Sequence, residues 1–110
     1  MPKTAPLPVE KVFEDIKAWC VGRNMVPPKY CYTKEQWKAR GETMCNDSHG
    51  TIIIEDCDLF APVNGPGAED PEDQPALDAL LADFTDLLNT RGYYYELGYQ
   101  WTMHLYWGFS

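Results

Sequence analysis

The chain has 110 residues, 45% of them hydrophobic and 14% aromatic, and its nine basic and 17 acidic residues give a net charge of −8. This length supports one cooperative core, so we expect a single compact domain over residues 1–110 and exclude a disordered chain or a second domain. An acidic chain without a transmembrane run or a secretory signal should be cytoplasmic and should bind neither nucleic acid nor membranes, whose surfaces are also anionic.

An amphipathic helix is predicted near the N-terminus. Pro2 and Pro6 make residues 1–7 an extended arm. Pro8 suits the first helical position, and Gly22 is placed to end the helix in a left-handed cap. The apolar residues between them recur at intervals of three and four, which indicates one buried face. They are Val9, Val12, Phe13, Ile16, Trp19 and Cys20.

A short second helix should follow. Residues 30–32 precede it as a short extended segment, and Thr33 with Gln36 matches a capping box at its start. The helix should cover residues 34–40. Its only large apolar residue, Trp37, either pins the helix to the body of the protein, which we expect, or contacts a partner from the solvent side.

The middle of the chain predicts strands. Residues 46–50 are turn formers, and the flanking segments 42–45 and 51–60 predict a β-hairpin. Three consecutive isoleucines at 52–54 indicate a strand that is buried on both faces, and therefore a central one.

A proline-rich acidic segment then leads into a long helix. Residues 61–75 hold four prolines, two glycines and four acidic residues, which predicts a mobile surface loop without regular structure. The helix should begin near Pro75 with Asp73 as its cap and end before Gly92. We expect Leu81 to lie near the centre of its buried face. The apolar positions are Leu77, Leu80, Leu81, Phe84, Leu87 and Leu88.

The C-terminal segment is rich in aromatic and β-branched residues, which favours strand. Gly98 should form a tight turn between antiparallel strands 93–96 and 100–107, and a bulge in one long strand is the alternative. Alternation predicts that one set of side chains faces the core. This set is Tyr99, Trp101, Met103, Leu105 and Trp107.

Together these elements predict an α+β fold. Two long amphipathic helices should pack on one face of a three- to four-stranded, mainly antiparallel sheet and form a two-layer sandwich. The opposite face of the sheet would carry Tyr94, His104 and Tyr106. An exposed aromatic face of this kind would be a binding surface. We favour the alternative, in which loops and the N-terminal arm cover much of it.

Catalytic and cofactor-binding motifs are absent. The sequence contains no GxSxG, no HExxH and no glycine-rich phosphate loop, so we expect a non-catalytic protein without a cofactor. The cysteines lack the CxxC spacing of common zinc sites, which predicts free, mostly buried thiols and no metal. The alternative is a small metal-binding or catalytic domain that uses Cys31, Cys45, His49 and Cys57.

Charge is segregated along the chain. Residues 1–40 hold eight basic and four acidic residues, a net charge of +4, whereas residues 41–110 hold one basic and 13 acidic residues, a net charge of −12. The acidic side chains of the loop and of the helix that follows should form one negative surface, unless they serve solubility alone. We expect this surface to bind a partner through Glu69, Asp70, Glu72, Asp73, Asp78, Asp83 and Asp86.

Small size, segregated charge and the lack of catalytic residues predict an inhibitor that occludes a basic surface of a protein partner. Carboxylates on a rigid element imitate phosphates, as in inhibitors of defence nucleases and in immunity proteins of nuclease toxins, an analogy of size and charge alone. The expected partner is a basic protein such as a nucleic-acid-binding protein or a nuclease. The alternative is a small subunit that joins a larger assembly by edge pairing of its aromatic C-terminal strand.

Overall fold

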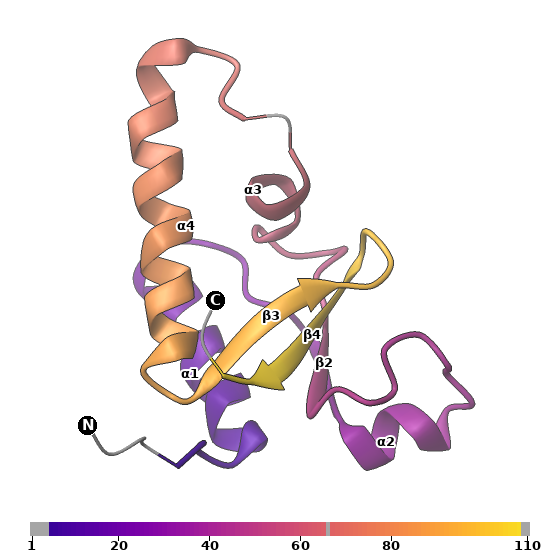
Figure 1. Ribbon diagram of the computed structural model, residues 1–110. Coiled ribbons are helices and arrows are strands. Elements are labelled where there is room, and N and C mark those ends of the chain that lie inside the picture. Colours follow the sequence, from indigo (N-terminus) through magenta and orange to yellow (C-terminus); the bar gives the residue numbers. More distant parts are fainter. Residues whose placement is uncertain (1–4, 66, 109–110) are drawn as a thin grey trace.

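The computed structural model describes residues 5–65 and 67–108, so that residues 1–4 of the predicted N-terminal arm lie outside the described part. It contains a four-stranded sheet with helices on both faces (Figure 1). In chain order the elements are α1 (Val9–Gly22), β1 (Tyr30–Thr33), α2 (Lys34–Ala39), β2 (Gly50–Ile53), α3 (Phe60–Asn64), a 3-10 helix (Pro71–Asp73), α4 (Gln74–Asn89), β3 (Tyr93–Leu97) and β4 (Thr102–Trp107).

The sheet has the order β1-β2-β4-β3, and every neighbouring pair is antiparallel. This confirms the α+β class and the predicted central position of the isoleucine strand, β2. The predicted hairpin between residues 42–45 and 51–60 is wrong, because β2 pairs with β1 on one side and with β4 on the other. Residues 42–45 lie in a turn-rich connection instead.

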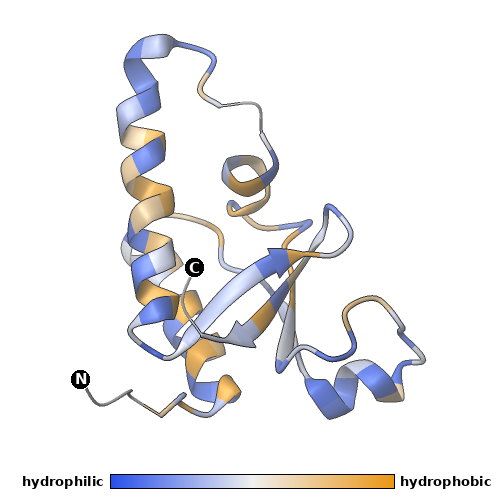
Figure 2. Cartoon of the chain, viewed as in Figure 1, coloured by the Kyte–Doolittle hydropathy of each residue, from blue (hydrophilic) through white to orange (hydrophobic). Residues whose placement is uncertain are grey.

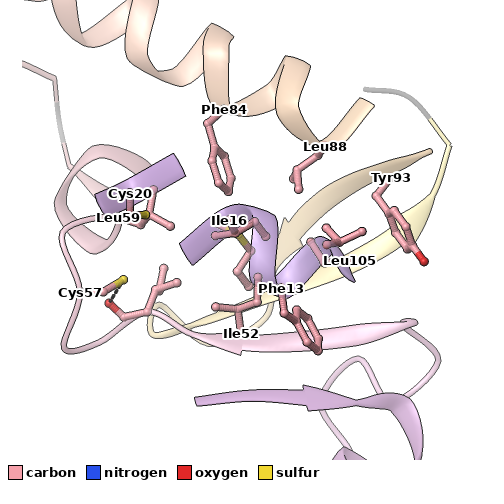
Figure 3. Close-up of a cluster of buried hydrophobic side chains, with 13 residues drawn as sticks. Phe13, Ile16, Cys20, Ile52, Cys57, Leu59, Phe84, Leu88, Tyr93 and Leu105 are labelled. Carbon is pink, nitrogen blue, oxygen red and sulfur yellow. Dashed lines mark hydrogen bonds between the residues drawn. The ribbon is translucent and has the colours of Figure 1, made fainter. Parts of the chain in front are cut away.

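Helices α1 and α4 cover one face of the sheet and enclose the core (Figure 3). Phe84 and Leu88 point from α4 toward Ile16 of α1 and Leu105 of β4. The predicted stripe of α1 is confirmed, with four of its six residues buried and the other two packed against them. The buried cluster comprises Val12, Phe13, Ile16, Cys20, Ile52, Ile54, Cys57, Leu59, Phe84, Leu88, Tyr93, Met103 and Leu105.

Gly50 lets α1 approach the sheet closely. A Cβ atom at this position would lie 2.6 Å from Cγ2 of Val9 and 2.8 Å from Cζ of Phe13. Both distances are below any normal carbon–carbon contact, so only glycine allows the first turns of α1 to pack directly on the end of β2.

Only the C-terminal half of α4 reaches the core. Phe84 and Leu88 are buried, whereas Leu77, Leu80 and Leu81 stay partly exposed and outside the buried cluster. The prediction that Leu81 is buried is therefore wrong. The N-terminal half of α4 extends past the sheet (Figure 1), so its apolar periodicity continues beyond the surface that could cover it.

Helix α2 adds a partial third layer that the two-layer prediction lacked. Its capping box forms as predicted, with Thr33 Oγ1 accepting from the backbone N–H of Gln36 and the Gln36 side chain accepting from the backbone N–H of Thr33. Trp37 is 1% exposed, and its indole N–H donates to the carbonyl of Met44 at 2.8 Å. This confirms that Trp37 pins α2 to the body of the protein.

Two local predictions are wrong. The left-handed residue after α1 is Asn24, with φ of 57°, whereas Gly22 belongs to the helix itself. Asparagine tolerates this conformation because its short side chain bonds locally. The segment 61–75 is not structureless, because it contains most of α3 and a 3-10 helix.

Candidate partner-binding surface

Five predicted site residues gather where the 3-10 helix joins α4. Their side chains are exposed, and the described part of the chain places no Lys or Arg in an ion pair with any of them. We call this group the acidic end; it comprises Glu69, Asp70, Glu72, Asp73 and Asp78. A sixth predicted residue, Asp86, is also exposed and lies two turns further along α4.

Gln74 fixes the acidic end in place, a role that the sequence did not reveal. Its Oε1 accepts from the backbone N–H of Ala68 at 2.9 Å, and its Nε2 donates to Asp78 at 2.8 Å. Gly67 makes room for it, since a Cβ there would lie 2.8 Å from Gln74 Oε1 and the backbone has φ of 110°. Asp73 occupies the predicted cap position of α4, but its side chain makes no capping hydrogen bond. The loop is thus tied to the helix by a glutamine amide.

Asp83 does not belong to this surface. Its carboxylate forms an ion pair with Arg23 and accepts a hydrogen bond from the indole N–H of Trp19 at 3.1 Å. The Arg23 guanidinium also lies over the Trp19 ring, 4.5 Å from its centroid. Asp83 therefore joins α4 to the C-terminal end of α1. The prediction failed because Asp83 sits at the margin of the apolar arc, where a neighbouring helix can reach it.

Replacing Asp83 by asparagine should lower the free energy of unfolding by about 1 kcal/mol, because a partly exposed ion pair and a charge-assisted hydrogen bond are lost. Asp86→Asn removes the same charge from an exposed position and should cost less than about 0.5 kcal/mol. Urea unfolding of the two variants measures the difference. Equal stabilities would show that the contacts of Asp83 contribute nothing.

A groove lies beside the projecting half of α4. It has a volume of about 510 Å³ and is lined by Arg23, Ala76, Ala79, Leu80 and Asp83. Two alanines and a leucine line it together with the ion pair of Arg23 and Asp83, so the groove offers a partly apolar contact close to the acidic end.

Basic residues lie at the opposite side of the molecule. Lys34 and Lys38 belong to α2, and Arg40 follows it directly. In Figure 1, α2 and the start of α4 occupy opposite corners of the fold. Figure 2 shows that both regions are mainly hydrophilic. These three basic residues therefore lie far from the acidic end, whereas Arg23 lies against α4, where it pairs with Asp83.

The second predicted surface, on the other face of the sheet, is largely closed. His104 is 0% exposed, and Trp37 of α2 packs over it with ring centroids 5.8 Å apart. Tyr94 and Tyr106 are partly buried and stack on each other at 5.6 Å. The expectation that this face is covered is correct, and α2 and residues 41–48 provide much of the cover.

His104 is held as a neutral ring. Its Nδ1 lies 2.9 Å from Thr51 Oγ1, and its Nε2 lies 2.9 Å from Thr102 Oγ1. Burial lowers the pKa of His104 from 6.5 to about 4, although the carboxylate of Asp47 acts in the opposite direction. A neutral imidazole between two hydroxyl groups satisfies both of its ring nitrogens within the protein.

The alternative metal set does not assemble. Among the residues that the structure describes, no group of three or more His, Cys, Asp or Glu side chains could hold a metal ion. Cys57 is buried and donates to the carbonyl of Ile54, while His49 stacks on Trp107 with ring centroids 3.9 Å apart. Burial raises the pKa of Cys31 to about 11, which disfavours the thiolate that a metal needs.

No protein-family model, no curated protein and no solved structure matches the chain. Within residues 5–65 and 67–108, none of the helices combines the length and the apolar character needed to cross a membrane.

Proposed function

We propose that the chain is a small, non-catalytic binding module that uses the acidic end to occupy a basic surface of a protein partner, most simply as an inhibitor. The observation that carries this proposal is a group of exposed carboxylates that pair with no Lys or Arg among the described residues, at the start of a helix that projects beyond its own sheet. Carboxylates fixed on a rigid element attract lysine and arginine side chains and accelerate association.

Apolar side chains next to these charges favour a protein partner over a purely solubilising role. Leu77, Leu80 and Leu81 remain partly exposed on the same half of α4. A helix half that served solubility alone would have no need for three leucines outside the core. An apolar strip flanked by carboxylates fits a partner whose basic surface also contains apolar residues, as the surfaces of nucleic-acid-binding proteins and nucleases do.

We also propose that the protein is located in the cytoplasm.

A second candidate function is assembly with another chain through an open edge of the sheet. β4 is flanked by β2 and β3, so β3 is the strand of the aromatic C-terminal segment that lies at an edge of the sheet. The outer strands of the described sheet, β1 and β3, are the ones that could pair with another chain. Size-exclusion chromatography with light scattering tests this candidate, since a subunit of this kind should form a defined complex.

The proposed function predicts a specific loss of association rate. Affinity capture from the native host, with mass spectrometry, would first identify the partner. The triple variant Glu72→Gln, Asp78→Asn, Asp86→Asn should then associate about 10-fold more slowly at low ionic strength, with the difference shrinking as salt is added. Stopped-flow kinetics measures both effects.

The matched control is Glu10→Gln, Glu14→Gln, Glu96→Gln, which removes the same number of exposed charges elsewhere. Its association rate should change little. Equal slowing of the two variants would mean that only net charge matters, and would reject the acidic end as the binding surface.

A further inference from the structure

Two aromatic side chains stack at the tip of the β3–β4 hairpin. The rings of Tyr99 and Trp101 lie 4.9 Å apart with an interplanar angle of 9°, and the side chains are 38% and 37% exposed. The sequence pattern predicted both residues for the core. They point elsewhere because they belong to the turn, where the alternation of β4 has not yet begun.

Hydrogen bonds hold this tip rigidly. The backbone N–H of Tyr99 donates to Thr102 Oγ1 at 2.8 Å, and the amide of Asn64 in α3 donates to the carbonyl of Gln100 at 2.7 Å. The carbonyl of Trp101 accepts from the backbone N–H of Ile54 at 2.9 Å. A rigid aromatic pair loses little conformational entropy when it binds, which is the property of an interface anchor.

Two exposed carboxylates follow the residue whose backbone is bonded to the hairpin tip. Glu55 and Asp56 come directly after Ile54, whose N–H binds the Trp101 carbonyl, and both are exposed. No ion pair involves either residue within the described ranges. The bond from Asn64 also links the tip to α3, which leads through the loop to the acidic end.

Two other places in the structure combine an aromatic ring with a carboxylate, and both hold an arginine. Arg23 lies 4.5 Å above the Trp19 ring and pairs with Asp83. In the same way, Arg40 lies 4.7 Å above the Tyr32 ring, and its Nη2 is 3.9 Å from Glu42. In both places an arginine covers an aromatic ring beside a carboxylate.

At the hairpin tip, no such arginine contact is found in the described part of the chain. We propose that Tyr99 and Trp101, with Glu55 and Asp56, bind an arginine side chain of the basic partner. This inference rests on the proposed function and adds an anchor to it. Arginine fits better than lysine, because its planar guanidinium stacks on a ring while its N–H groups bind a carboxylate.

The probe is a short synthetic peptide of alternating arginine and glycine, with the matched lysine peptide for comparison. Trp101→Leu keeps an apolar side chain but removes the ring, so the affinity for the arginine peptide should fall about 5- to 30-fold. Trp101→Phe should restore much of the affinity, and the arginine peptide should bind better than the lysine peptide. Isothermal titration calorimetry at low ionic strength measures the affinities, and circular dichroism confirms that each variant is folded.

The matched control is Trp107→Leu, since Trp107 is also exposed, at 58%, but stacks on His49 at the other end of β4. This variant should bind the arginine peptide normally. An equal loss in Trp107→Leu and Trp101→Leu would overturn the inference, as would an absence of arginine-peptide binding at concentrations up to about 1 mM.

Failure of the inference and failure of the proposed function give different results. If the triple variant Glu72→Gln, Asp78→Asn, Asp86→Asn weakens peptide binding while Trp101→Leu does not, the acidic end and Asp86 bind the peptide and the aromatic anchor is wrong. If Trp101→Leu weakens binding and the triple variant does not, the anchor is supported and the acidic end is not the main surface.

Discussion

Replacing Phe84 by alanine should lower the free energy of unfolding by about 3–5 kcal/mol. The side chain is 1% exposed, and its ring lies 5.3 Å from that of Trp19 and 5.7 Å from that of Tyr95. The truncation therefore removes the contacts that join α4 to both α1 and β3, and leaves a cavity in the core. Equilibrium urea unfolding, followed by far-ultraviolet circular dichroism, measures the loss.

Leu81→Ala is the matched control, because it truncates the same helix at a partly exposed position. Its cost should be about 1 kcal/mol or less. A cost close to that of Phe84→Ala would contradict the division of α4 into a buried half and a projecting half.

Stability should also fall by about 2–3 kcal/mol between pH 7 and about pH 4, on account of His104 alone. Burial lowers the pKa of His104 to about 4 in the folded state, whereas an unfolded histidine titrates near 6.5. The neutral ring is therefore favoured in the folded protein. Its stabilising contribution is complete above pH 6.5 and is lost progressively as the pH falls toward 4.

Two measurements separate His104 from the carboxylates that titrate in the same range. A proton NMR titration of the ring should give a midpoint near pH 4. Urea unfolding of His104→Gln should show a smaller pH dependence than the wild-type protein over the same interval. A ring that titrates near pH 6.5 in the folded protein would show that His104 is accessible to water.

Local sequence patterns predicted the helices and turns that are stabilised by interactions between neighbouring residues. The stripe from Val12 to Cys20 forms the buried face of α1, and the Thr33–Gln36 capping box starts α2. Gly98 lies in the turn between β3 and β4, as expected. Each of these depends on residues only a few positions apart, so the sequence contains the whole interaction.

Contacts between distant segments could not be predicted in the same way. The pairing of β1 with β2 skips a helix and a turn-rich connection, and a strong turn signal at residues 46–50 favoured the nearer partner. The end of the buried part of α4 depends on where the sheet stops, which periodicity does not encode. The same limit applies to His104, whose cover comes from Trp37.

At the candidate site, some residues were predicted correctly and others were not. Exposure of the acidic loop and of Asp78 and Asp86 follows from composition and helical spacing. Asp83 looked equivalent to them, but its partners, Trp19 and Arg23, are some 60 residues away in the chain. The aromatic pair at the hairpin tip was missed because alternation was extended through a turn.

The central position of β4 has a consequence for synthesis of the protein. Gly50 of β2 pairs with Leu105 of β4. The middle of the sheet therefore cannot form until the ribosome has synthesised residues more than 50 positions further along the chain. Closing such a long loop is entropically costly, and pairing at this separation slows folding. Until then one edge of β2, with its isoleucines, is open to other chains. The nascent chain, rather than the folded protein, is therefore the state most exposed to aggregation.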